Sequence, residues 1–172
     1  MPLDIIGLGS RSEASSSTAQ GRDVQTPPLS SRVILIAEDN LDEFAIMECA
    51  YAGTRLPFRL EHVQTGRGVL DYLIGNGPYA DRQKFPYPEL LILDLNMPFL
   101  SGFDVLNILL RIARLPRLPV AVMSNSTLAS ERNATLHLGA TCAYMKPNSL
   151  QEMQRILAEI VQKCIPNSGN AQ

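Results

Sequence analysis

The sequence predicts an α/β protein with a doubly wound, five-stranded parallel sheet in the strand order 2-1-3-4-5. Two observations predict this fold: short apolar runs alternate with segments of helical periodicity, and polar residues follow four of the runs at their carboxyl ends. Strands that alternate with helices form a parallel sheet covered on both faces, and right-handed crossovers leave few strand orders. The order 2-1-3-4-5 is the simplest, and its ligand site lies where the first and third strands part.

Each strand is expected where a short apolar run meets a polar turn. The five runs lie at residues 32–37, 59–63, 90–94, 120–123 and 142–145. The third run, Leu90 to Leu93, is uninterrupted in its apolar character, as expected for a strand that is buried on both faces. Asp94, which ends this run, is its one carboxylate and is the strongest single candidate for a functional residue.

A helix is expected after each strand, with capping residues at its ends. The five helices are expected at about residues 40–53, 69–74, 101–114, 128–138 and 149–163. Asn40 is expected to cap the first helix, with Glu43 in capping-box spacing. Ser101 and Ser149 are expected to begin the third and fifth helices, and Gly139 to end the fourth.

The chain of 172 residues predicts one domain with extra sequence at its ends. Residues 1–30 are expected to form a flexible tail, because Ser, Thr, Gln, Gly and Pro dominate residues 10–31. Within it, Leu3 to Leu8 is the apolar segment that could dock elsewhere. The domain is expected at 31–165, followed by a short tail at 166–172. A Pro-containing loop of roughly fourteen residues after the second helix is expected to be functional or mobile.

Composition excludes several classes of protein. The net charge of −2 argues against nucleic acid or an anionic membrane as the partner. No apolar run approaches the length of a membrane span, and the N-terminus does not resemble a secretory signal. Cys49, Cys142 and Cys164 form no C-x-x-C pair, which suits a reducing compartment and predicts a cytoplasmic protein. We interpret the three as small buried or half-buried hydrophobes.

Four of the expected strands end at side chains that can do chemistry. These are Glu38 and Asp39 after the first strand, Asp94 after the third, Ser124 after the fourth and Lys146 after the fifth. A carboxylate inside a buried strand is costly, but at the carboxyl end it faces the crevice where such sheets bind ligands. Singly, these residues could be a solvated strand end, a helix cap and a surface lysine. Together, at matching positions, they predict one site.

The chemistry of this site follows from its charges. Carboxylates that lie close together repel one another, and a divalent cation relieves the repulsion. Mg²⁺ prefers carboxylate and carbonyl oxygens, so we expect Mg²⁺, or Mn²⁺, near Asp39 and Asp94. A carboxylate is also a nucleophile toward phosphorus and yields an aspartyl phosphate. The metal, Lys146 and the Ser124 hydroxyl could share the charge of the phosphoryl oxygens.

These motifs resemble the receiver domain of two-component response regulators over about residues 32–163. They are Ala37-Glu38-Asp39-Asn40, Leu93-Asp94-Leu95-Asn96-Met97-Pro98, Ser124 after an apolar strand, and Gly139-Ala140 seven residues before Lys146-Pro147. The resemblance implies the flavodoxin-like fold of the single-domain chemotaxis regulator. Residues 68–73 and the loop ending at Tyr87-Pro88 are also similar to single-domain regulators that partner phytochrome-type kinases.

The resemblance implies a role for each residue of the predicted site. Asp94 would accept a phosphoryl group from a phosphohistidine on a sensor histidine kinase. Asp39, Asp94 and the backbone carbonyl of Asn96 would bind Mg²⁺, and Glu38 would act through water. Lys146 would contact the phosphoryl group. Such a protein assists its own phosphorylation and dephosphorylation and is not an enzyme with a separate substrate.

The chain departs from the family at two positions. Ala143 stands where an aromatic switch residue is usual, and Tyr144, on the opposite face of its strand, is not expected to replace it. Asn125 stands where a small residue is usual, and we expect its amide to slow exchange of the phosphoryl group with water. His62 and His137 are interpreted as ordinary residues away from the site.

Three functions remain open from the sequence. A phosphorylated module would signal through protein contacts, because little chain follows Lys163 to form a DNA-binding domain. It could form a two-fold homodimer, in which Leu109, Ile112 and Leu115 could take part unless they belong to the core. A receiver-like module could instead act without phosphate. An aspartyl phosphatase of the dehalogenase-like type would need a second Asp where this chain has Asn96.

Overall fold

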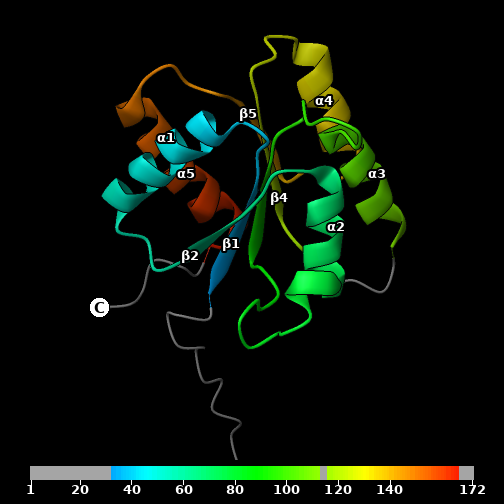
Figure 1. The fold of residues 1–172 in the computed structure, drawn as a ribbon. Coiled ribbons are helices and arrows are strands. Elements are labelled where there is room, and N and C mark those ends of the chain that lie inside the picture. The colour runs from blue at the N-terminus through cyan, green and yellow to red at the C-terminus, as the bar shows by residue number, and fades with distance from the viewer. Residues whose placement is uncertain (1–31, 113–115, 167–172) are drawn as a thin grey trace, which may run out of the picture.

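The computed structural model describes residues 32–112 and 116–166, which form a parallel sheet with helices on both faces (Figure 1). The strands are β1 Val33–Ala37, β2 Arg59–Val63, β3 Leu90–Leu93, β4 Val120–Ser124 and β5 Cys142–Met145. Their order in the sheet is β2-β1-β3-β4-β5, and every neighbouring pair is parallel. The predicted fold class and strand order are therefore confirmed.

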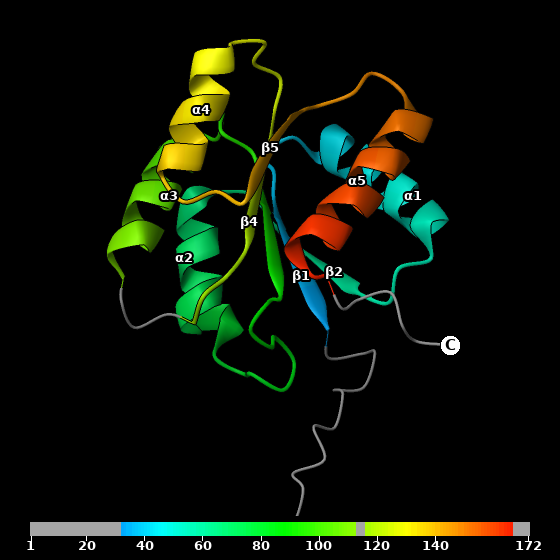
Figure 2. The ribbon, with the colours of Figure 1, turned by 180° about the vertical axis from the view of Figure 1, so that it is seen from behind.

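The helices lie in two layers. They are α1 Leu41–Thr54, α2 Gly66–Ile74, α3 Gly102–Arg111, α4 Ala129–His137 and α5 Leu150–Cys164, with a 3₁₀ turn, η2, at Gly77–Tyr79. Helices α1 and α5 pack side by side on one face of the sheet, and α2, α3 and α4 lie on the other (Figures 1 and 2). This doubly wound arrangement leaves the carboxyl ends of all the strands at one edge.

The central strands are buried on both faces. All residues of β1, β3 and β4 are buried. Because successive side chains point to opposite faces, Ile34 and Ile36 pack with α1 and α5, whereas Val33, Leu35 and Ala37 pack with α2 and α3. Each such aliphatic side chain contributes roughly 1.5–3 kcal/mol when fully buried. The two cores hold the strand ends, and hence the site, in fixed positions.

Helix α2 begins three residues earlier than its sequence predicts. The Thr65 hydroxyl caps it by accepting a hydrogen bond from the Gly68 amide. Two glycines in the first turn weaken the helical signal in the sequence. Gly66 is required there by packing, because a Cβ at this position would lie 2.4 Å from the Leu100 carbonyl oxygen.

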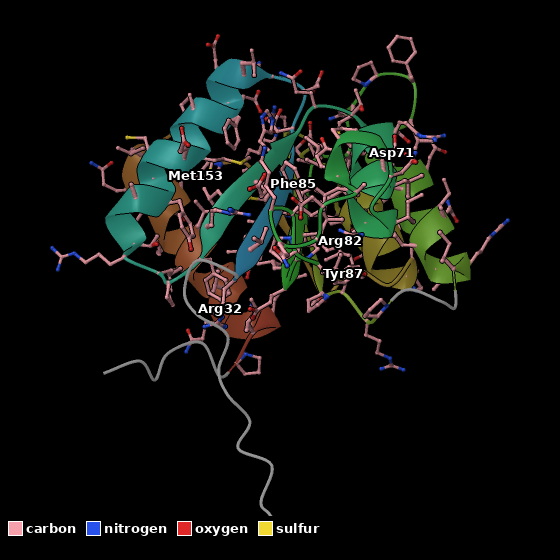
Figure 3. The ribbon with its side chains drawn as sticks, turned by 60° about the horizontal axis from the view of Figure 1, so that its bottom comes forward. Arg32, Asp71, Arg82, Phe85, Tyr87 and Met153 are labelled. Atoms are coloured by element: carbon pink, nitrogen blue, oxygen red, sulfur yellow. The ribbon has the colours of Figure 1, made fainter. Side chains whose placement is uncertain are left out.

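Arg82 ties the long loop that follows α2 to the end of that helix. The Arg82 guanidinium donates hydrogen bonds to the backbone carbonyls of Tyr72, Leu73 and Phe85 at 2.6 to 3.2 Å. Tyr72, Tyr79 and Phe85 form an aromatic cluster beneath α2, and Figure 3 shows Arg82, Phe85 and Tyr87 close together. These bonds satisfy the last carbonyls of α2, so the loop closes that helix.

The interpretation of the cysteines is correct for two of them. Cys142 and Cys164 are buried with their sulfur atoms 3.9 Å apart, but Cys49 is exposed on α1. Within the described residues, no helix combines the length and apolar character needed to cross a membrane. Residues 1–30 and Leu3 to Leu8, the end of the predicted third helix and most of the C-terminal tail lie outside the described residues.

Candidate functional site

The predicted site residues meet at the carboxyl edge of the sheet. Parallel pairing of β1 with β3 puts Glu38 next to Asp94, whose amide bonds the Ala37 carbonyl. Pairing of β4 with β5 puts Ser124 next to Lys146, whose amide bonds the Ser124 carbonyl. The exposed fractions of Glu38, Asp94, Ser124 and Lys146 are 1, 5, 3 and 7%. Such burial of two acids and a lysine needs mutual pairing.

Lys146 provides that pairing. Its ammonium nitrogen lies 2.7 Å from Glu38 Oε2, 2.5 Å from Glu43 Oε2 and 3.3 Å from Asp94 Oδ2. Burial opposes the charged form of Lys146, but its three acidic partners raise its pKa above the ordinary value. Lys146 is therefore held as a cation at the centre of the site.

Glu43 is the site residue that sequence reasoning missed. We predicted it as the second half of a capping box, but its carboxylate bonds Lys146 and accepts a hydrogen bond from Asn125 Nδ2 at 3.3 Å. Asn40 caps α1 as predicted, by accepting from the amides of Asp42 and Glu43. The backbone amide of Asn40 donates a hydrogen bond to Glu38 Oε1, where a capping box would have it donate to Glu43. The sequence did offer a signal for Glu43, which is an acidic residue in the first turn of the helix that follows Glu38-Asp39.

Three carboxylates form a cluster that can hold a cation. One oxygen from each of Glu38, Asp39 and Asp94 lies within 4.8 Å of the others. Asp39 is exposed, whereas Asp94 Oδ1 is buried and has no hydrogen-bond partner among the described residues. A buried carboxylate oxygen without a donor is suited to bind a cation. The cluster fits Mg²⁺ or Mn²⁺.

The site shifts the pKa values of Glu38 and Glu43 in opposite directions. Burial raises the pKa of Glu38, and the nearby charge of Asp94 adds to this effect, although Lys146 opposes it. The hydrogen bond from Lys146 lowers the pKa of Glu43, which is more exposed. Of these two acids, Glu38 is the one whose charged form its surroundings disfavour.

The segment after Asp94 packs tightly against α3. A Cβ on Gly102 would lie 2.3 Å from the Asp94 carbonyl oxygen, and the Gly102 amide bonds the Leu95 carbonyl. Ser101 caps α3 as predicted, and together with Asp104 it forms a capping box. Asn96, whose carbonyl we expect to bind metal, is exposed in this segment. The backbone that carries Asp94 is thus fixed from both sides.

Ser124 and Tyr144 have contacts that limit their roles. Ser124 Oγ accepts a hydrogen bond from the Ser126 amide at 3.2 Å, which shapes the turn after β4. Tyr144 packs on the side of α1 and α5, where its hydroxyl bonds Glu159 and Lys163 at 2.8 Å. Ala143 packs on the opposite side of the sheet. As predicted, Tyr144 does not take the place of an aromatic residue at position 143.

One histidine lies closer to the site than predicted. His62 Nε2 is 2.7 Å from the backbone carbonyl oxygen of Glu38, and its ring stacks on Phe44 with a centroid distance of 3.8 Å. The prediction that His62 lies away from this edge is therefore wrong, because β2 pairs directly with β1 there. His137 bonds the Asn133 carbonyl within α4.

Comparisons with known proteins identify the family of the chain. The family model of the response regulator receiver domain matches residues 34–158. The response regulator Rcp1 of Synechocystis sp. is 26% identical over 138 residues, which cover 80% of this chain and 90% of Rcp1. The Mn²⁺-bound form of Rcp1 has a TM-score of 0.66 at 25% identity, covering 76% of this chain and 92% of that one.

Two further solved structures resemble the chain at 28% identity. Response regulator RPA3017, from red light signaling of R. palustris, has a TM-score of 0.72 and covers 76% of this chain and 92% of its own. The phosphorylated cyanobacterial phytochrome response regulator RcpA has a TM-score of 0.68 and covers 76 and 91%. Since the family model spans most of the sequence, the chain belongs to the response regulator receiver domain family of two-component signalling.

Proposed function

We propose that the protein accepts a phosphoryl group on Asp94 from the phosphohistidine of a histidine kinase and passes the signal on through protein contacts. The observation that carries this proposal is the environment of Asp94. One of its oxygens is buried without a hydrogen-bond partner among the described residues, and the other faces the Lys146 ammonium at 3.3 Å. A nucleophilic oxygen that has no hydrogen bond to give up is suited to such a transfer.

In the proposed step, an Asp94 carboxylate oxygen forms a bond to phosphorus while the phosphorus–nitrogen bond to histidine breaks. The electron pair of that bond stays on the imidazole. Lys146 would contact the transferred group, and the buried Ser124 hydroxyl would lie near it. Asp39, Asp94 and the Asn96 carbonyl would hold Mg²⁺ or Mn²⁺, with Glu38 acting through water. The metal would neutralise charge on the phosphoryl oxygens.

The relatives support the kind of donor. RcpA is a phytochrome response regulator and RPA3017 acts in red light signaling. We therefore infer a phytochrome-type histidine kinase as the donor. We also propose a cytoplasmic location, with the receiver domain at residues 31–165 and tails at 1–30 and 166–172. We propose neither nucleic acid nor a membrane as a binding partner. A homodimer that uses Leu109 and Ile112, both half-buried, remains compatible with it.

Acetyl phosphate labelling tests the proposal. With Mg²⁺, the wild-type protein should gain the mass of one phosphoryl group, and Asp94→Asn should gain none. Asp81→Asn is a matched control, because the Asp81 carboxylate only accepts backbone hydrogen bonds in an exposed loop, which an amide oxygen can also do. A wild-type protein that is never labelled would favour a module that acts without phosphate. Hydrolysis of a free phosphomonoester would instead favour a phosphatase.

A further inference from the structure

The Lys146 ammonium already donates two hydrogen bonds, one to Glu38 and one to Glu43. An ammonium group carries three N–H donors and no acceptor. Glu38, Glu43 and Asp94 supply three oxygens within 3.3 Å, and the two glutamates are the closest. A phosphoryl group on Asp94 would therefore compete with these two carboxylates for the charge of Lys146.

Glu43 is the partner that can leave. The Glu38 side chain is 1% exposed and is also fixed by the Asn40 amide, so its release would strand a buried charge. Asp94 itself would carry the phosphoryl group. The Glu43 side chain is 32% exposed and lies in the first turn of α1, from which it can rotate into water.

Release of Glu43 would change more than one ion pair. Its other oxygen accepts the hydrogen bond from Asn125, which follows β4, so both α1 and the segment after Ser124 lose a contact. Glu43, Asn125 and Lys146 line a cavity of about 480 Å³. The lining also includes apolar residues of α1 and α5, among them Met47 and Met153, and Figure 3 shows Met153 beside α1.

The aromatic switch residue that is usual in the family is absent from this site. Position 143 is alanine, and the Tyr144 hydroxyl is bonded to Glu159 and Lys163 of α5. A change at Lys146 needs some other side chain with two arrangements to carry it outward. Glu43 fits this requirement, because it links Lys146 directly to a helix on the surface.

We propose that Glu43 is a positioning residue that holds Lys146 before phosphorylation and is displaced by a phosphoryl group on Asp94, which passes the change into the cavity between α1 and α5. This inference rests on the proposed function. It predicts that Glu43 competes with the phosphoryl group for one cation, so that removing its charge strengthens binding of that group. It also predicts that side chains in the cavity between α1 and α5 change their environment when Asp94 carries a phosphoryl group.

Beryllofluoride, which mimics a phosphoryl group on a carboxylate, tests the competition. In Mg²⁺, Glu43→Gln should bind beryllofluoride about fivefold more tightly than wild type, the change expected from losing one competing ion pair. Glu48→Gln is the matched control, because Glu48 is an exposed glutamate of the same helix, and it should bind as wild type does. Glu43→Ala should behave like Glu43→Gln and serves if the latter does not fold.

Methyl NMR of Met47 and Met153 tests the route. In wild type and Glu48→Gln, beryllofluoride should shift both methyl resonances. In Glu43→Gln without beryllofluoride, both resonances should already lie part of the way toward their bound positions. Two results would overturn this inference and leave the proposed function standing. One is wild-type affinity for beryllofluoride in both Glu43 variants, and the other is methyl resonances that do not shift when beryllofluoride binds Asp94. If wild type neither binds beryllofluoride nor gains phosphate, both proposals are wrong.

Discussion

At the scale of single residues, Lys146 keeps several acids together in a buried site. Replacing it with alanine leaves Glu38 buried without its cation. Loss of one partner of a buried ion pair costs about 3–5 kcal/mol, so we expect Lys146→Ala to lower the free energy of unfolding by about 3 kcal/mol. Urea unfolding measures this change. Lys163→Ala removes an exposed lysine from an ion pair with Glu159 and should have little effect; equal losses in the two variants would contradict the assigned role of Lys146.

The pKa of Glu43 predicts how pH affects its contribution. The Lys146 hydrogen bond lowers that pKa below the ordinary value of 4.5. A carboxyl group with a lower pKa in the folded state stabilises the protein above its unfolded pKa, and this contribution disappears as the pH falls through the folded pKa. Glu43→Gln should therefore be less stable than wild type at neutral pH, and the gap should close on acidification below 4.5.

Urea unfolding midpoints of wild type and Glu43→Gln across this pH range provide the test. Glu48→Gln, which changes an exposed glutamate of α1, should follow wild type at every pH. A gap between Glu43→Gln and wild type that stays constant as the pH falls would mean that the pair with Lys146 is not its source.

Asn125 should control how quickly the phosphoryl group is lost. Its side chain follows Ser124 directly at the end of β4 and, before phosphorylation, donates a hydrogen bond to the Glu43 carboxylate at 3.3 Å. We expect this side chain to limit the approach of water, so phosphorylated Asn125→Ala should lose phosphate faster than wild type. Following the phosphorylated mass over time measures the rate, and an unchanged rate would remove the idea.

At the scale of elements, the start of α3 supports the segment that carries Asp94. Gly102→Ala would place a methyl group 2.3 Å from the Asp94 carbonyl oxygen, so the helix and the segment must separate. Overpacking of this kind costs about 1–3 kcal/mol, and we expect slower labelling by acetyl phosphate as well. Gly53→Ala in α1 is the control, because its Cβ would meet only the flexible end of Gln154. Normal stability and labelling in Gly102→Ala would contradict this role.

At the scale of the whole molecule, much of the fold and site was predictable because the signals are local. Apolar runs and caps such as Ser101 mark the elements, and a parallel sheet brings the strand ends that carry Asp94 and Lys146 to one edge. Glu43 was missed because its contact with Lys146 depends on how α1 packs beside the loop after β5. His62 was misplaced for a similar reason, since strand pairing decides which residues meet Glu38.

The site as a whole is a buried lysine surrounded by acids, in which Asp94 Oδ1 has no hydrogen-bond partner among the described residues. Our central claim is that Asp94, which carries this oxygen, accepts a phosphoryl group. Incubation with Mg²⁺ and a phosphohistidine-bearing kinase domain, followed by peptide mass spectrometry, tests the claim most directly. The account predicts one added phosphoryl group located at Asp94. Transfer to another side chain, or no transfer from any such donor, would contradict it.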